Sequence, residues 1–204
     1  MLAPVPIYPD APFPVERLVV TGGRLWASAH KNPYNSLHVD WSFGVGFAPL
    51  EVGGQTYDTG LSIEIETRDI RRVDQFAGMV RHDTEHDFNI GSFYLFDYRG
   101  SRDTHFRVHS VCGRKLDVEA QVLVDLGDSY IDPRPPLTTV RVRTEVVFES
   151  ILVSSYGVQS EPDEARLLGI ASELFDLNAF APPTPKWDSY QDKPVLNLYF
   201  VPLT

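Results

Sequence analysis

The sequence predicts an α+β fold dominated by antiparallel strands, arranged as a sandwich or a strongly curved sheet. Most segments carry small or apolar side chains at every second residue, which is the period of a half-buried strand. Only two segments have apolar residues at helical spacing. We therefore expect about eight to ten strands with two helices packed on one side or end. The 204 residues are expected to form one domain, residues 1–204.

The clearest strand pattern lies between residues 104 and 126. Two runs place small or apolar side chains on alternate positions: Phe106, Val108, Ser110 and Cys112, then Leu116, Val118, Ala120, Val122, Val124 and Leu126. For the two sets to share a face, Cys112 must oppose Leu116 across a three-residue turn that contains Gly113. The pattern therefore predicts a β-hairpin with Cys112 on its packed face as a buried, inert thiol.

Further strands are predicted before this hairpin. Their bounds are 17–29, 37–47, 50–57 as a tight hairpin, 61–67 and 92–98. Gly22 and Gly23 divide the first of them into a hairpin or a bulged strand. Gly44 and Gly46 lie on the polar side of the second, where they either bend the sheet or leave room for an aromatic ring, another backbone or a ligand. The proline-rich residues 1–15 are expected to form an extended arm.

Two segments are predicted to be helical. Asp69 is well placed to cap a short helix, whose apolar side would contain Ile70, Val73, Phe76, Ala77 and Val80. Ser160 is expected to begin a longer helix, because acidic residues follow it at the positive end of the helix dipole. The buried stripe of that helix would contain Leu167, Leu168, Ile170, Ala171, Leu174 and Phe175.

The C-terminal half alternates strands with proline-rich segments. Residues 127–137 hold three prolines and are expected to form a loop or crossover outside the sheet. Residues 138–153 predict a long strand beside 116–126, with arginines matched to carboxylates. No strand is predicted for the proline-rich residues 181–187, whereas residues 195–201 predict a last strand.

Charge and hydropathy exclude some classes of partner. The formal net charge is -10 and the pI is near 5.0, which disfavours nucleic acid because phosphate contacts need a basic surface. A basic partner is physically easier. The N-terminus lacks the apolar run of a signal peptide, and no stretch is long enough for a membrane span. We therefore expect a cytoplasmic protein that does not bind membranes.

One short motif resembles a metalloprotease signature. Residues 82–86 spell His-Asp-Thr-Glu-His, which matches the H-x-x-E-H pattern of the inverted zinc metalloproteases. That chemistry requires the motif to lie on a helix, where positions four residues apart share a face. Here the motif contains almost no apolar residue and runs into a polar segment. We therefore expect an exposed charged turn.

A second group of residues suggests a metal site on the face of a sheet. The predicted register places His109 opposite Glu119, and His105 shares that face. His38 and Asp40 lie on the polar face of another strand. Histidines and a carboxylate inside a β-sandwich are typical of sites for iron or manganese. However, His105 and His109 would be about 13 Å apart on a regular strand, so an ordinary solvated face with a His109–Glu119 pair is the simpler interpretation.

Aromatic residues on one predicted strand and in a proline-rich segment suggest protein binding. The candidates are Tyr94, Phe96, Tyr98, Trp187 and Tyr190. Tyrosine and tryptophan are enriched at interface hot spots, although ordinary core aromatics of a sandwich are the simpler interpretation. The predicted function is a non-enzymatic acidic protein that recognises another protein, without a cofactor. An inhibitor or immunity protein that neutralises a basic target and an assembly subunit both fit this description.

The alternative prediction is a small metal-dependent β-sandwich enzyme. It would hold one divalent transition metal with His38, Asp40, His105, His109 and Glu119. No P-loop, nucleophile elbow, dinucleotide-binding glycine motif or C-x-x-C pair supports another kind of enzyme. The sequence leaves the ligand, the strand order and the oligomeric state open.

Overall fold

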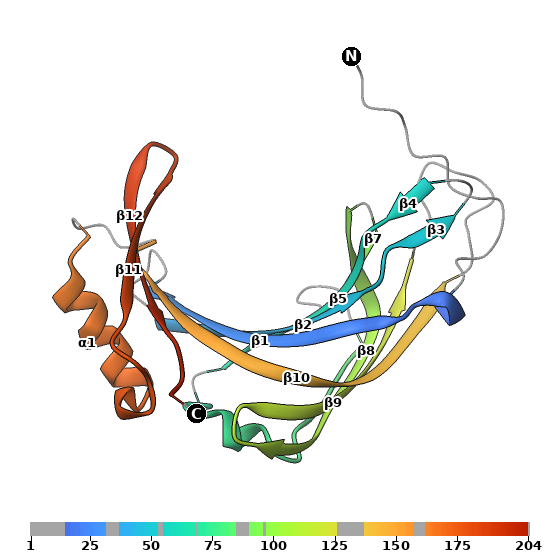
Figure 1. The fold of residues 1–204 in the computed structure, drawn as a ribbon, viewed down its shortest axis with the longest axis horizontal. Coiled ribbons are helices and arrows are strands. Elements are labelled where there is room, and N and C mark those ends of the chain that lie inside the picture. The colour runs from blue at the N-terminus through green and yellow to red at the C-terminus, as the bar shows by residue number, and fades with distance from the viewer. Residues whose placement is uncertain are drawn as a thin grey trace.

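The fold is mostly β, as the alternating pattern predicts (Figure 1). The computed structural model describes residues 15–31, 37–52, 55–67, 69–84, 90–95, 97–125, 137–156 and 162–203. The strands are β1 (Val20–Lys31), β2 (Leu37–Phe47), β3 (Leu50–Val52), β4 (Gln55–Tyr57), β5 (Thr59–Glu66), β6 (Val80–Asp83), β7 (Gly91–Leu95), β8 (Asp97–Cys112), β9 (Lys115–Val124), β10 (Thr138–Ser154), β11 (Thr184–Tyr190) and β12 (Lys193–Phe200). The described helical elements are α1 (Glu164–Leu174) and short 3-10 turns at Val15–Arg17, Val73–Phe76 and Leu177–Ala179.

Seven strands close into a mixed β-barrel. Their order is β1-β2-β5-β7-β8-β9-β10, and β10 returns to β1. Neighbouring strands are antiparallel except for β1 and β10, which are parallel from Gly23 and Val146 to Ala29 and Val153. The predicted sandwich with two helices is therefore wrong: the described residues form a closed barrel with extra strands and one α-helix. The prediction failed because the alternating pattern identifies strands but does not specify which of them pair.

Gly23 permits the closure of the barrel. A Cβ atom at this position would lie 2.7 Å from Val146 Cγ2 and 2.8 Å from the backbone oxygen of Glu145. Both distances are shorter than van der Waals contact. The first and last strands of the barrel can approach this closely because position 23 has no side chain.

Aromatic rings fill the barrel interior. Trp41 and Phe43 on β2 point inward and are each 1% exposed. Phe76, from the 3-10 turn, packs edge-on against both, with ring centroids 5.0 Å from Trp41 and 5.2 Å from Phe43. Phe106 on β8 completes this group at 4.7 Å from Phe43. These contacts join one wall of the barrel to the opposite wall through the core.

Strands β12 and β11 extend the sheet beyond the barrel. β12 pairs with the last residues of β10, from Ile151 to Ser154, and β11 pairs with β12 at the edge. Helix α1 lies on the outer side of this hairpin in Figure 1 and buries Leu167, Ile170, Ala171 and Leu174. β11 was not predicted, because Pro185 weakens its strand pattern; an edge position tolerates proline since one side of the strand needs no ladder partner.

The two helix predictions differ in outcome. The first is wrong: its residues form the 3-10 turn Val73–Phe76, and Val80 begins β6. Gly78 adopts a positive φ of 76°, which ends helical geometry and returns the chain to the sheet. The second helix is confirmed as α1 with the predicted buried stripe, but its N-cap is Asp163, whose side chain accepts a hydrogen bond from the Ala165 amide. Ser160 lies outside the described residues.

The central hairpin is confirmed, but its register is not as predicted. The turn has two residues, with Gly113 at a φ of 56°, and Cys112 pairs with Lys115. A bulge between Val108 and Ser110 then shifts the register, so that Arg107 and not His109 opposes Glu119. Because a bulge changes which face the following residues occupy, Cys112 is exposed, and its predicted burial is wrong.

Other strand predictions are confirmed at 37–47, 50–57 and 138–153, and β10 pairs with β9 as expected. The predicted strand 92–98 is confirmed for residues 92–95, which belong to β7, but not as one continuous strand, because the chain reverses and β7 pairs with β8 from Asp97 onward. Residues 99–103, where the sequence predicts a turn into the central hairpin, belong instead to β8. The arm 1–15 and the loop 127–137 lie almost wholly outside the described residues. Among the described residues, no helix has the length and apolar character needed to cross a membrane.

Candidate functional site

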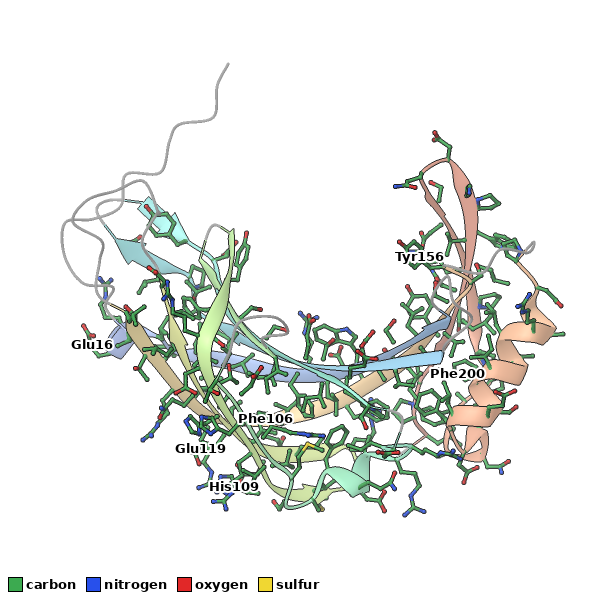
Figure 2. The ribbon with its side chains drawn as sticks, turned by 180° about the vertical axis from the view of Figure 1, so that it is seen from behind. Glu16, Phe106, His109, Glu119, Tyr156 and Phe200 are labelled. Carbon is green, nitrogen blue, oxygen red and sulfur yellow. The ribbon has the colours of Figure 1, made fainter. Side chains whose placement is uncertain are left out.

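The long strands of the barrel form the base of a U. Figure 1 shows the β11–β12 hairpin rising at one end of β1, β2 and β10, and β3, β4 and β7 rising at the other end. Figure 2 places Tyr156 on the inner side of this U, whereas His109 and Glu119 lie on its outer side. The side chains on the inner side are those that β1, β2 and β5 direct away from the core. Two rows of them lie in register: Trp26, Ser42 and Glu64, then Ser28, Asp40 and Glu66.

We call this inner surface the concave face, and it contains two hollows. The first has a volume of about 500 Å³ and lies over β1, β2, β5 and β7. Its lining includes Arg24, Trp26, Gly44, Gly46, Glu64 and Tyr94. A Cβ atom on Gly44 would lie 3.1 Å from Cζ3 of the Trp26 ring. The ring therefore covers Gly44, which matches one of the alternatives left open by the sequence, close approach of an aromatic ring.

The second hollow has a volume of about 390 Å³ and lies where β1, β10, β11 and β12 meet. Its lining includes Ser28, Ser154, Tyr156, Asp188 and Asn197. The Ser154 hydroxyl donates to Asn197 Oδ1 at 2.7 Å, and Asn197 Nδ2 donates to Asp188 Oδ2 at 2.9 Å. This chain of bonds across three strands fixes the Asp188 carboxylate at the edge of the hollow.

Carboxylates outnumber cations among the described residues of the concave face. The carboxylates are Asp40, Glu64, Glu66 and Asp188, and the cations are Arg24, Lys186 and Lys193, the last on the same side of β12 as Val195 and Asn197. Lys186 Nζ lies 3.2 Å from Asp188 Oδ1, so one of the three cations is already paired with a carboxylate of the same face. The remaining balance is negative, as it is for the whole chain.

The structure separates the aromatic residues that the sequence suggested for binding. Tyr94 lines the first hollow and is 36% exposed. Trp187 is 59% exposed on β11, but strand alternation places it on the opposite face of the hairpin from Asp188. Phe96 and the side chains of Tyr98 and Tyr190 lie outside the described residues. Of the five candidates, the structure therefore places one on the concave face and one away from it.

The five residues suggested for a metal site lie in different parts of the fold. Asp40 is on β2 in the concave face, and the side chain of His38 lies outside the described residues. His109 and Glu119 lie on the outer surface of β8 and β9, where their side chains meet at 3.0 Å between Nε2 and Oε2. The bulge permits this contact diagonally, although the two residues are not directly opposed. His105 has different neighbours.

His105 lies beside the first histidine of the metalloprotease-like motif. His82 and Asp83 belong to β6, so this part of the motif is a strand and the prediction of an exposed turn does not hold there; Glu85 and His86 lie outside the described residues. The His82 and His105 rings stack with centroids 3.7 Å apart. Asp103 contacts both of them, at 2.9 Å from His82 Nε2 and 3.5 Å from His105 Nε2. We call these three residues the histidine cluster.

Ion pairs hold the neighbouring outer surface of β9 and β10. Arg143 donates two hydrogen bonds to the Asp117 carboxylate, at 3.1 Å from Nε and 2.6 Å from Nη2. The hydrogen bonds and positive charge of Arg143 hold the pKa of Asp117 below its usual range. Lys115 lies 2.9 Å from Glu145, whose hydrogen bond and negative charge raise the pKa of that lysine. These pairs confirm the expected matching of cations and carboxylates between the strands.

Sequence reasoning missed three residues of these sites. Trp26 lies in an apolar run of the sequence. The signal that could have identified it is its position among the alternate residues of β1 that point away from the barrel core. Tyr156 follows the end of β10 and has no pattern that identifies it. Asp103 precedes His105 by two residues, so the D-x-H spacing on a strand was visible, but the chain had been expected to turn at that point.

Comparisons of this chain with models of known protein families, with curated proteins and with solved structures found no match.

Proposed function

We propose that this protein is a non-enzymatic binding protein that holds an extended segment of a basic partner polypeptide on its concave face. The observation that carries the proposal is the pair of hollows on one face, linked along β1 by Trp26 and Ser28. The proposal is supported by the shape of this face, by its charge and by its aromatic side chains.

The shape favours an extended chain over a compact small molecule. Small-molecule sites bury most of their ligand in a concave pocket, whereas both hollows here are broad and open to solvent. Along β1, the residues between Gly22 and Ser28 that do not point into the core line first one hollow, as far as Trp26, and then the other, at Ser28. That stretch spans about 20 Å at about 3.3 Å per residue, which an extended segment of about seven residues would cover.

The charge of the face favours a basic partner. Glu64 and Glu66 are exposed beside the first hollow, and Asp188 is held at the second. Complementary charge increases the rate of association and disfavours acidic competitors, while its contribution to affinity depends on burial. A segment that carries lysine or arginine at both ends would place cations near both groups of carboxylates.

Aromatic side chains supply apolar contact at both ends. Trp26 and Tyr94 line the first hollow, and Tyr156, which is 45% exposed, lines the second. Rigid aromatic anchors lose little conformational entropy on binding, and such residues dominate interface energies. The inhibitor, immunity and assembly roles expected from the sequence are all compatible with this mode of binding.

The test is a titration with fluorescent peptides of about seven residues, in a lysine- and arginine-rich set and an acidic set of equal apolar content. We expect binding of basic peptides by anisotropy, with affinity that falls about tenfold or more between low salt and about 0.5 M salt. Trp26→Ala should weaken binding by about tenfold or more, because hot-spot aromatics typically contribute upwards of about 1.4 kcal/mol.

Trp187→Ala is the matched control, since it removes an exposed tryptophan from the other face of the β11–β12 hairpin. It should leave peptide affinity unchanged. Equal affinity for acidic and basic peptides would contradict the charge argument. Loss of binding in Trp187→Ala, with Trp26→Ala unaffected, would move the binding site away from the concave face.

A further inference from the structure

The pairing of β6 with β8 builds the histidine cluster. In this antiparallel pair His82 is directly opposite His105, and Asp83 is opposite Thr104. Asp103 precedes His105 by two residues on β8, so both side chains point to the same face of the strand. Phe106, at the next position, is buried in the barrel, so the cluster lies on the outer surface. Three side chains from two strands therefore converge outside the barrel.

The ligand atoms of the cluster are spaced nearly as a metal ion requires. One ring nitrogen of His82, one ring nitrogen of His105 and an oxygen of Asp103 all lie within 4.8 Å of one another. Asp103 Oδ1 lies 2.9 Å from His82 Nε2, and Asp103 Oδ2 lies 3.5 Å from His105 Nε2. Around a tetrahedral zinc ion with bonds of about 2.0–2.1 Å, neighbouring ligand atoms are about 3.3 Å apart. Both contacts with Asp103 are close to that separation.

Metal binding requires one adjustment, which concerns the orientation of the two imidazole rings. The rings are stacked with an interplanar angle of 17°, so the lone pairs of their nitrogens lie in nearly parallel planes and do not meet at one point. One ring must turn about its Cβ–Cγ bond for both lone pairs to reach one ion. The side chains of His82 and His105 are 47% and 49% exposed, which leaves room for this rotation.

We propose that His82, Asp103 and His105 form a site for one divalent transition-metal ion. Two imidazoles and one carboxylate are a ligand set that suits zinc and iron(II), and the exposed position leaves the remaining coordination sites to water. The single carboxylate gives the set a net negative charge when both histidines are neutral. A metal ion would replace the hydrogen bond between His82 and Asp103 with two coordination bonds to the same atoms.

The bound ion would fasten β6 to the barrel. β6 has four residues and, among the described strands, pairs with β8 alone. His82 comes from β6, while Asp103 and His105 come from β8. An ion held by both strands stabilises the folded state, because the separated ligands of the unfolded chain bind it more weakly. This inference is independent of the concave face, and the proposed site shares only His105 with the metal site suggested by the sequence.

The test is isothermal titration of the full-length, untagged protein with Zn²⁺, accompanied by Co²⁺ absorption spectroscopy. We expect one ion per chain, visible absorption bands on Co²⁺ binding, and a higher melting temperature in Zn²⁺. His82→Ala, Asp103→Asn and His105→Ala should each weaken Zn²⁺ binding by about tenfold or more and abolish most of the thermal shift.

His109→Ala is the matched control, because it also removes from β8 a partly exposed imidazole that is paired with a carboxylate, that of Glu119. It should bind Zn²⁺ as the unchanged protein does. Circular dichroism establishes that each variant is folded before titration. Absence of Zn²⁺ binding up to millimolar concentration, or undiminished binding in folded His105→Ala, would overturn the proposal.

Discussion

The two faces of β1 and β2 differ completely in packing although they come from alternate residues of the same strands. The side of these strands that faces the barrel core holds Trp41 and Phe43, which are each 1% exposed and contact rings from other parts of the chain. On the opposite side, which forms the concave face, Trp26 covers Gly44 and faces the first hollow. Each side thus contains a tryptophan, but only Trp41, on the core side, joins elements that are distant in sequence.

This difference separates the residues that stabilise the barrel from those available for binding. A ring that packs against three or more distant groups cannot change without leaving a cavity. A ring that lies on a glycine and borders solvent can change at much smaller cost. Substitutions on the side that faces the barrel core should therefore affect folding, whereas those on the concave face should affect recognition.

The largest expected effect is that of Trp41→Ala. We expect the free energy of unfolding to fall by about 3–5 kcal/mol, as for other large-to-small changes of buried aromatic residues. The lower half of that range is expected, because Trp41 Nε1 is buried and has no hydrogen-bond partner among the described residues, so the native ring already bears a desolvation cost. Urea unfolding followed by circular dichroism measures the change.

Trp187→Ala serves as the comparison for stability as well, because 59% of this residue is exposed. It should lower the free energy of unfolding by no more than about 1 kcal/mol. A loss as large as that of Trp41→Ala would show that exposure does not distinguish the two positions.

A smaller effect is expected at the seam between β1 and β10. Gly23→Ala should destabilise the protein by about 1–3 kcal/mol, because the new methyl group meets the backbone oxygen of Glu145 as well as Val146. Gly22→Ala is the adjacent control: a Cβ atom there would have no neighbour within 4 Å. It should be neutral or stabilise by up to about 1 kcal/mol, since alanine restricts the unfolded chain.

Urea unfolding of both glycine variants sharpens the comparison between packed and open positions. Destabilisation at Gly23 without destabilisation at Gly22 is expected only if β1 and β10 make the close parallel contact. Equal effects of the two substitutions would argue against this closure of the barrel.

The smallest expected effect is the pH dependence of the Arg143–Asp117 pair on the outer surface. The pKa of Asp117 is lowered in the folded protein by the Arg143 hydrogen bonds and charge. The unfolded chain therefore takes up the proton first as pH falls, and the contribution of the pair is complete above about pH 4 and disappears below it. Both side chains are partly exposed, so the contribution is small.

Comparison with Asp117→Asn measures this contribution. The difference in free energy of unfolding between the two proteins should be present at neutral pH and should shrink towards zero as pH falls below about 4. A difference that stays constant over this range would contradict the lowered pKa of Asp117.

Much of the strand content could be predicted from the sequence, and the errors have local physical causes. The alternation in residues 37–47 predicts both β2 and its buried face, because side chains alternate on any strand whatever its partner. Cys112 was misplaced because one bulge near His109 reverses the parity of the following residues. The short helix was misplaced because the apolar residues at helical spacing include Phe76, which is buried from a single 3-10 turn.

Little of either candidate site could be predicted. The sequence identified Tyr94 and His105, and it noted that Gly44 could admit a ring, but it did not bring Trp26 to Gly44 or His82 to His105. Those two contacts depend on the pairing of β1 with β2 and of β6 with β8 in their observed registers. A change of one residue in either register would place the partners on opposite faces.

The sequence by itself determined that the protein is mostly β, where most of its strands lie and most of the residues that fill its core, because hydrophobic alternation acts over a few neighbouring residues. The tertiary structure decided that β1 meets β10 in parallel, that the sheet closes, and that the concave face and the histidine cluster exist. Each of these depends on contacts between segments far apart in the chain. Such contacts are selected by packing and backbone pairing of the whole fold, as the close approach at Gly23 illustrates.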